Sequence, residues 1–282
     1  MKIVCENQDG EKLTFENAFP CWVTSADGLG ADYEVYTSKN SGQDGESYNG
    51  SDAKKRNIVI TLEILTEYFS EYKNKVYSFF QPRSIGTLYY YEDDLAKKIK
   101  YYAEKITPSD EGSTHTFVIS LICPDPKFYA LMDQLTQLAM WAGGIEFPFE
   151  IPQADEFTVE TKVNTLIGNV RNDSAVSMGL TIKFMATGTV VNPSLFDVNR
   201  HLLLQANITM HAGDCIIITT GDGNKRAQMV SGSSVTNINN LLQYPPAWLK
   251  AYRGDNLFRY NASSGIDELS VSILSTPAYW GA

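Results

Sequence analysis

Residues 215–230 read CIIITTGDGNKRAQMV, two runs of strand-forming residues joined by the tetrapeptide GDGN. Gly and Asn tolerate the left-handed backbone of tight hairpin turns, so this pattern predicts a β-hairpin. A calcium loop that starts at Asp222 would need carboxylates at alternate positions and a Glu at the twelfth, where Arg226 and Ser233 stand instead. A phosphate-binding loop would lead into a helix, whereas a second strand follows here. We therefore interpret the stretch as a turn and not as a ligand site.

The hairpin is one of several short apolar runs in the second half of the chain, separated by turn residues. Such spacing is typical of a β-sandwich. The expected strands are FTVET (157–161), VSMGLTIKFMATG (176–188), NITM (207–210), CIIITT (215–220), RAQMV (226–230), LFRYN (257–261) and ELSVSIL (268–274).

The first half mixes strands with three predicted helices. Ile58, Ile60, Leu62 and Ile64 alternate with more polar neighbours and predict a strand with one apolar face. Helical spacing of apolar residues predicts helices over 67–82, 92–106 and 129–142. In the second of these the expected apolar stripe is Leu95, Ile99, Tyr102, Ala103 and Ile106, and Asp93 and Asp94 suit its first turn.

The polar segment 38–57, SKNSGQDGESYNGSDAKKRN, contains few apolar residues and predicts a long exposed loop or arm. The bulk composition belongs to a globular protein: 282 residues, 43% hydrophobic, 12% aromatic, with a net charge of −10. That length favours two domains. The acidic charge disfavours a broad nucleic-acid surface. No signal peptide or membrane span is expected, so the protein should be soluble and made in the cytoplasm.

Residues that carry chemistry are scattered. The four cysteines and three histidines form no clustered pairs, so we expect reduced structural thiols and no metal site. No nucleophile elbow or zinc-protease helix motif is present. We therefore expect no catalytic residues, no cofactor and no enzymatic activity.

Several patterns, taken in order, resemble the distal tail protein family of siphophages and related tail-like particles. In the first half they are WVTSADGLG, SGQDGESY, RNIVITLEI, VYSFFQPRSIGTLYY and ISLICPDPKFY. In the second half they are GGIEFPFEIP, VRNDSAVSMGLTIKFMATGTVVNPSLFDV, AGDCIIITTGDGNKRAQMVSG and the closing YRGDNLFRYNASSGIDELSVSILSTPAYWGA. The resemblance extends over nearly the whole chain.

The resemblance implies a mainly β fold with a few helices, divided into two domains. Residues 1–128 would be an α+β ring-forming domain that assembles a homohexamer. Residues 129–282 would be a galectin-like β-sandwich, with the domain boundary lying somewhere in 124–146. A ring of this kind would join the tail tube protein to the tail-tip or fibre protein and to a receptor-binding protein. It would be located in the virion tail after assembly in the host cytoplasm, with no nucleic-acid or membrane partner.

Candidate subunit contacts are Tyr48, in the polar arm, and the run Tyr89, Tyr90 and Tyr91. Three consecutive tyrosines in a strand place aromatics on both faces, so one face is a candidate for contact with another subunit. The alternative is a tyrosine-rich core on both sides.

A second hypothesis is an accessory module that binds host cell-wall polysaccharide. Sugar-binding galectins carry a His-x-Asn-Pro-Arg strand and a stacking Trp. This chain has Asn192-Pro193, but Val190 and Ser194 occupy the His and Arg positions. That departure argues for the fold without the lectin site. Trp248 is the candidate for sugar stacking, with packing in a core or interface as the alternative.

Overall fold

The computed structural model describes residues 1–93, 95–109, 114–143, 160–164 and 167–282. The chain divides into two compact units, residues 1–131 with 278–282 (unit 1) and residues 132–277 (unit 2). The fold is mainly β, with a single α-helix among the described residues, and this confirms the predicted class. The ring-forming role of 1–128 and the separate domain 129–282 stay predictions.

Unit 1 is built on one large antiparallel sheet with the order β2-β1-β7-β8-β9-β6-β3. Two shorter strands extend it, because β10 pairs with both β8 and β25. The strands of unit 1 are β1 (Lys2–Glu6), β2 (Lys12–Phe15), β3 (Cys21–Asp27), β4 (Tyr33–Ser38), β5 (Ser47–Ala53), β6 (Arg56–Leu65), β7 (Ile85–Glu92), β8 (Leu95–Ser109), β9 (Thr114–Cys123), β10 (Phe128–Ala130) and β25 (Ala278–Tyr279).

The alternation predicted for Ile58, Ile60, Leu62 and Ile64 is confirmed, since all four side chains are fully buried on one face of β6. The first predicted helix is also confirmed, as α1 (Thr66–Phe79). Its Phe69, Val76 and Phe79 are buried in the core of unit 1.

The predicted helix over 92–106 is wrong, because this segment is strand β8, paired along its length with β7 and β9. The helical stripe was a coincidence of spacing. Along β8, Ile99 and Tyr101 are buried while Leu95 is 65% exposed and Tyr102 is 40% exposed, which is the period of a strand. Asp93 has φ +50° in the β7–β8 turn and lies in no helix, and Asp94 lies outside the described residues.

The third predicted helix, 129–142, is also wrong. Residues 128–130 form β10, and β11 (Gln134–Gly143) runs antiparallel to β24 (Leu269–Ser275). Leu138 is buried in the core of unit 2, and the ladder register shifts beside it. Pairing with β24 therefore overrides the local helical spacing. The motif GGIEFPFEIP beyond Gly143 and most of FTVET lie outside the described residues.

Unit 2 is a β-sandwich. One sheet has the order β12-β11-β24-β14-β19-β20-β21, and the other has the order β13-β23-β16-β17. Apolar side chains of both sheets share one core, with Ile182, Ile218 and Val271 from the first and Phe258 and Leu195 from the second. This arrangement agrees with the predicted sandwich.

The remaining elements of unit 2 are short strands and two turns of 3₁₀-helix. They are β12 (Glu160–Asn164), β13 (Ile167–Asn172), β14 (Met178–Ala186), β15 (Val190–Val191), β16 (Ser194–Asp197), β17 (Leu202–Gln205), β18 (Thr209–Met210), β19 (Cys215–Gly221), β20 (Asn224–Ser231), β21 (Ser234–Asn237), η1 (Asn239–Leu241), β22 (Lys250–Ala251), β23 (Gly254–Asn261) and η2 (Ile266–Glu268).

The stretch 215–230 forms the predicted hairpin. Strands β19 and β20 pair from Cys215 opposite Val230 to Gly221 opposite Asn224, so Asp222 and Gly223 make a two-residue turn. Gly223 has φ +73°, the conformation for which this position favours glycine. The Asp222 carboxylate pairs with the Lys250 ammonium at 2.7 Å, a role in the fold and not in cation binding.

Candidate interaction surfaces

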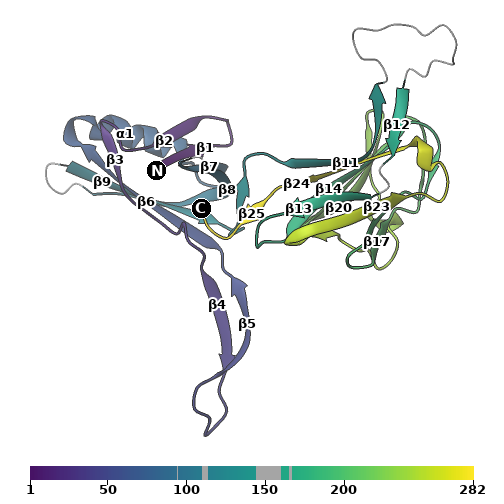
Figure 1. Cartoon of the computed structure of the whole chain (residues 1–282). Helices are drawn as coiled ribbons and strands as arrows, with labels where there is room; N and C mark the ends of the chain where they lie inside the picture. Colours follow the sequence, from purple (N-terminus) through teal and green to yellow (C-terminus); the bar gives the residue numbers. More distant parts are fainter. Residues whose placement is uncertain (94, 110–113, 144–159, 165–166) are drawn as a thin grey trace. The chain divides into compact units, whose positions relative to one another are not determined.

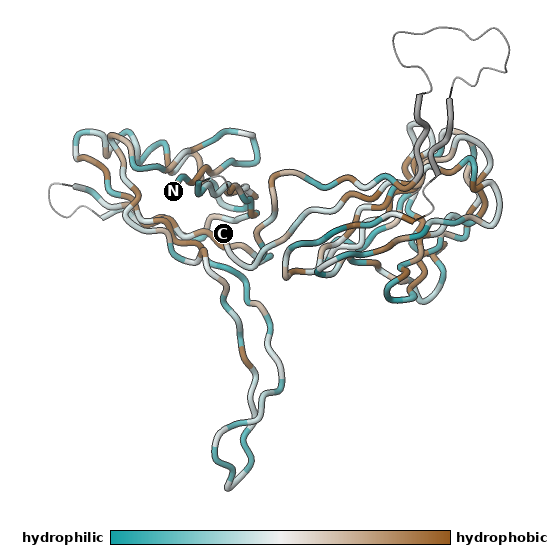
Figure 2. The backbone as a smooth tube through the Cα atoms, viewed as in Figure 1, coloured by the Kyte–Doolittle hydropathy of each residue, from teal (hydrophilic) through white to brown (hydrophobic). Residues whose placement is uncertain are grey.

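Strands β4 and β5 form a two-stranded hairpin, called the arm, which projects from the sheet of unit 1 (Figure 1). The arm covers residues 33–53, so it includes most of the predicted exposed segment 38–57 and shows that segment to be ordered as a hairpin. In Figure 2 the arm is mostly white and teal, whereas the strands of the two units carry much of the brown.

Four large apolar or aromatic side chains of the arm are nevertheless exposed. The exposed fractions are 47% for Tyr33, 57% for Val35, 44% for Tyr36 and 66% for Tyr48. An isolated two-stranded hairpin is marginally stable in water, because neither face is covered. The arm is therefore a candidate for burial against a partner.

The arm also carries an unfavourable charge pair. Glu34 lies directly opposite Asp52 across the two strands, and like charges in that position destabilise a hairpin. Lys54 offsets part of this repulsion through a contact of 3.5 Å with Glu34. Glu34 also raises the pKa of Tyr36, whose hydroxyl donates to the Glu34 carboxylate at 3.5 Å. This face of the arm would be stabilised by an additional cation.

The root of the arm is held by Arg56, the first residue of β6. Arg56 is only 6% exposed, and its guanidinium donates to the backbone carbonyls of Gly28 at 2.6 Å, Pro126 at 2.9 Å, Trp280 at 2.5 Å and Gly30. Burial lowers the pKa of Arg56. A planar guanidinium suits this task because its donors point in several fixed directions.

Residues 278–282 complete this root. The Ala282 amide donates to the Leu29 carbonyl at 3.0 Å, and the rings of Tyr33 and Trp280 meet edge to face at 5.9 Å. Lys97 donates to the Gly281 carbonyl at 3.1 Å. The arm therefore emerges from a well-packed base, although no described residue of unit 1 covers its length. Sequence reasoning missed this base, because a lone arginine after a polar run gives no local signal of burial.

The tyrosine run of β7 is divided between the two faces of the sheet. Tyr90 is 6% exposed and packs in the core of unit 1, whereas Tyr89 and Tyr91 are half-buried on the opposite, outward face. The Lys12 ammonium lies 5.7 Å from the centre of the Tyr89 ring. Burial and the neighbouring Glu6 raise the pKa of Tyr89. Tyr89 and Tyr91 thus remain candidates for subunit contact, whereas Tyr90 anchors β7 by packing in the core of unit 1.

Trp248 precedes β22, is half-buried and packs against the core of unit 2. At the lectin-like motif, Val190 is fully buried and Asn192 has φ +52°. The Asn192 amide donates to the Ser263 hydroxyl at 3.3 Å. These contacts give the motif a structural role, while the predicted sugar-stacking role of Trp248 stays untested.

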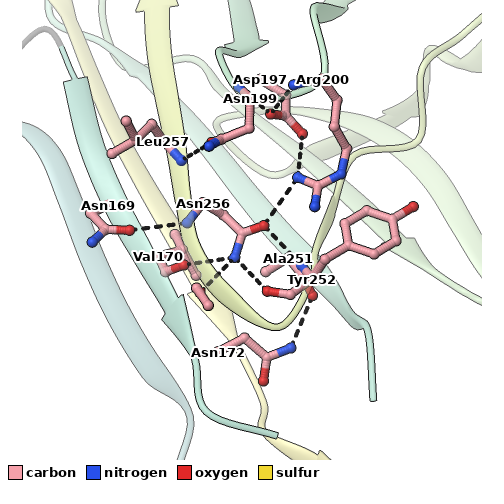
Figure 3. A network of polar contacts seen from close by, with 11 residues as sticks. Asn169, Val170, Asn172, Asp197, Asn199, Arg200, Ala251, Tyr252, Asn256 and Leu257 are labelled. Atoms are coloured by element: carbon pink, nitrogen blue, oxygen red, sulfur yellow. Dashed lines mark hydrogen bonds and ion pairs between the residues drawn. The ribbon is translucent and has the colours of Figure 1, made fainter. Parts of the chain in front are cut away.

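A buried polar network in unit 2 surrounds Asn256 of β23 (Figure 3). Its side-chain amide donates to the carbonyls of Val170 at 3.1 Å and Tyr252 at 2.6 Å, and its side-chain oxygen accepts from Arg200 at 3.2 Å. The Arg200 guanidinium stacks 3.8 Å from the centre of the Tyr252 ring. Arg200 also pairs with Asp197 at 3.4 Å. Because these groups satisfy one another, we interpret the network as a support for the turn between β22 and β23.

The thiols of Cys5 and Cys123 are buried in the core of unit 1. Burial raises the pKa of the Cys5 thiol and raises that of Cys123 to about 12, so both stay protonated at neutral pH. Within the described ranges no group of three His, Cys, Asp or Glu residues is placed to hold a metal ion. The helices among the same residues are too short or too polar to cross a membrane.

Residues 8–123 match the model of the phage tail protein RIFT-related domain, which lies within unit 1. The whole fold is similar to the crystal structure of the SPP1 Dit (gp 19.1) protein, described as a paradigm of hub adsorption apparatus in phages that infect Gram-positive bacteria. That match has a TM-score of 0.70 and 12% identity and covers 98% of both chains. A component of the phage P2 baseplate in its activated conformation with Ca matches with a TM-score of 0.49 and 10% identity, over 98% of this chain and 97% of that one.

A comparison with curated protein sequences gave no match. The family model and the shared fold together confirm the predicted resemblance to phage distal tail proteins.

Proposed function

We propose, from the premise that residues 8–123 are a phage tail protein RIFT-related domain, that this chain is a structural hub protein of a phage or phage-like tail tip. The observation that carries the proposal is the match of the whole fold to a hub protein, over 98% of both chains. Its work is assembly, and catalysis forms no part of it. The place of action is the virion tail, after assembly in the host cytoplasm.

In this proposal six copies form a ring. A closed ring needs a heterologous interface, in which one surface of a copy meets a different surface of its neighbour. The arm supports such an interface because it exposes aromatic side chains away from the packed body of unit 1. Tyr48 on the arm and Tyr89 and Tyr91 on β7 are the candidate contact residues.

The ring would join the tail tube protein on one side to the tail-tip or fibre protein on the other, with a receptor-binding protein attached around it. Stable permanent assemblies bury large, apolar interfaces. The exposed Tyr33, Val35, Tyr36 and Tyr48 supply apolar surface for that purpose.

Native mass spectrometry and electron microscopy of the purified full chain test the proposal. We expect a closed ring of six copies at micromolar concentration. A strict monomer at high concentration, together with saturable binding of wall polysaccharide that Trp248→Ala abolishes, would contradict the hub and favour the carbohydrate-binding alternative.

A further inference from the structure

The arm is acidic as well as aromatic. Between residues 33 and 53 it carries Glu34, Asp44, Glu46 and Asp52 against one cation, Lys39. Glu34 and Asp52 face each other across the strands, beside the exposed Tyr36. The arm therefore presents a surface that an apolar and basic partner would complement.

A surface of the opposite character lies elsewhere in unit 1, on the outward side of β7 and β8. In the ladder Tyr89 lies opposite Lys98, Thr87 opposite Lys100, and Ile85 opposite Tyr102. Adjacent residues of a strand point to opposite faces, and the inward ones here are the buried Leu88, Tyr90, Ile99 and Tyr101. The outward set Ile85, Tyr89, Lys98, Lys100 and Tyr102 is called the tyrosine–lysine face.

The tyrosine–lysine face is open. Ile85 on β7 is 39% exposed and Tyr102 on β8 is 40% exposed, and Lys100 on β8 is exposed as well. Lysines at its margin are already occupied, because Lys2 pairs with Glu16 at 3.4 Å and Lys12 pairs with Glu6 at 3.4 Å. The positive charge that remains on the face comes from Lys98 and Lys100. The half-buried Lys98 donates to the Leu131 carbonyl at 3.2 Å, a neutral acceptor that leaves its charge uncompensated.

We propose that the arm of one copy docks on the tyrosine–lysine face of a neighbouring copy, with Glu34 and Asp52 against Lys98 and Lys100. This inference rests on the proposed homo-oligomer and names the two surfaces that meet in it. Docking reduces the repulsion between Glu34 and Asp52 because it places cations beside them. It also covers apolar side chains on both surfaces. About ten residues per leg give the arm a reach of about 30 Å, enough to extend onto a second copy.

The two surfaces are different parts of the polypeptide, so their contact is heterologous. Any open row of copies would therefore have an undocked arm at one end and an uncovered tyrosine–lysine face at the other. Only closure into a ring satisfies both. Charge complementarity of this kind also sets the register of the interface and excludes wrong pairings.

Reciprocal charge reversal tests the docking. One variant carries Glu34→Lys and Asp52→Lys, and the other carries Lys98→Glu and Lys100→Glu. Each alone places like charges against each other, so we expect the concentration at which half the chains assemble to rise at least about tenfold. An equimolar mixture of the two variants pairs every lysine arm with a glutamate face and every wild-type arm with a wild-type face. The mixture should therefore recover assembly with the variants alternating around the ring.

Two controls keep the result specific. Glu71→Lys and Lys75→Glu reverse exposed charges on α1, which packs on the inward face of the sheet, and should leave assembly within about twofold of wild type. Circular dichroism verifies that every variant is folded. Zero-length carbodiimide cross-linking of the wild-type assembly, read by mass spectrometry, should join Glu34 or Asp52 of one copy to Lys98 or Lys100 of another.

The outcomes separate the two proposals. A monomeric wild-type protein contradicts the proposed hub. A wild-type ring that both variants form equally well, or cross-links that join the arm to another surface, overturns the docking and leaves the hub proposal standing. Failure of the mixture to recover assembly while both variants stay folded also overturns the docking.

Discussion

Hairpins β19–β20 and β4–β5 have similar local chemistry and different surroundings. Both are antiparallel and both have glycines with positive φ in their turns. In β19–β20 alternate side chains such as Ile216, Ile218 and Ala227 are fully buried, whereas the apolar side chains of β4–β5 stay exposed. The first hairpin is a part of a sandwich core, and the second is not covered by any described residue of its own unit. The contrast makes the arm a candidate for burial against a partner.

The largest expected effect separates the two hairpins by stability. Ile218→Ala removes a fully buried side chain and should lower the free energy of unfolding by about 2–5 kcal/mol. Val35→Ala on the arm should change it by no more than about 0.5 kcal/mol in the unassembled protein. Urea unfolding, with hydrogen exchange of residues 215–231 and 33–53, measures both. Equal losses at the two sites would show that the arm is packed within its own chain.

The root of the arm gives the second prediction. Arg56→Met removes the donor to four backbone carbonyls at the arm and should destabilise unit 1 by about 1–3 kcal/mol. Arg56→Lys keeps the charge but loses the planar guanidinium, so its free energy of unfolding should lie between those of Arg56→Met and wild type. Faster hydrogen exchange at residues 28–33 would locate the loss at the root. An unchanged exchange rate there would mean that other contacts hold the arm.

Glycines near the two hairpins give the third prediction. Gly223→Ala places a side chain into open space at φ +73°, so only the backbone resists it, at about 1 kcal/mol. Gly28→Ala, at φ +80°, would also drive its Cβ into the Asn57 carbonyl and should cost clearly more. Thermal unfolding of both variants ranks them. The reverse order would show that the arm root adjusts freely.

Acidification gives the smallest expected effect. Asp214, just before β19, has its pKa lowered by hydrogen bonds from Ser231 and from the His211 amide, which it accepts at 2.8 Å. A carboxyl with a lowered folded pKa stabilises the fold above its unfolded pKa of about 4, and this contribution disappears as the pH falls through the folded value. Asp214→Asn should cost at most about 1 kcal/mol at pH 7. The difference from wild type should vanish in strong acid, and a difference independent of pH would contradict the ionic cause.

Strands that bury one face were predictable from the sequence, because alternation is a local signal. Ile58 to Ile64 and the hairpin at 215–230 are the clearest cases. Strand β8 was not, because its lysines and tyrosines fit helical spacing equally well and only pairing with β7 and β9 decides between the two. The candidate surfaces were predictable in part. Polar composition located the arm, but the inward turn of Tyr90 and the outward turn of Lys98 and Lys100 depend on register, which no local pattern specifies.

Arg56 donates to Trp280, and β10 pairs with β25, so unit 1 is completed by residues that follow all of unit 2 in the sequence. During translation the ribosome must synthesise the entire sandwich before these contacts can form. The contacts at the base of the arm therefore form only after all of unit 2 has been synthesised, and a nascent chain lacks them until Trp280 has left the ribosome.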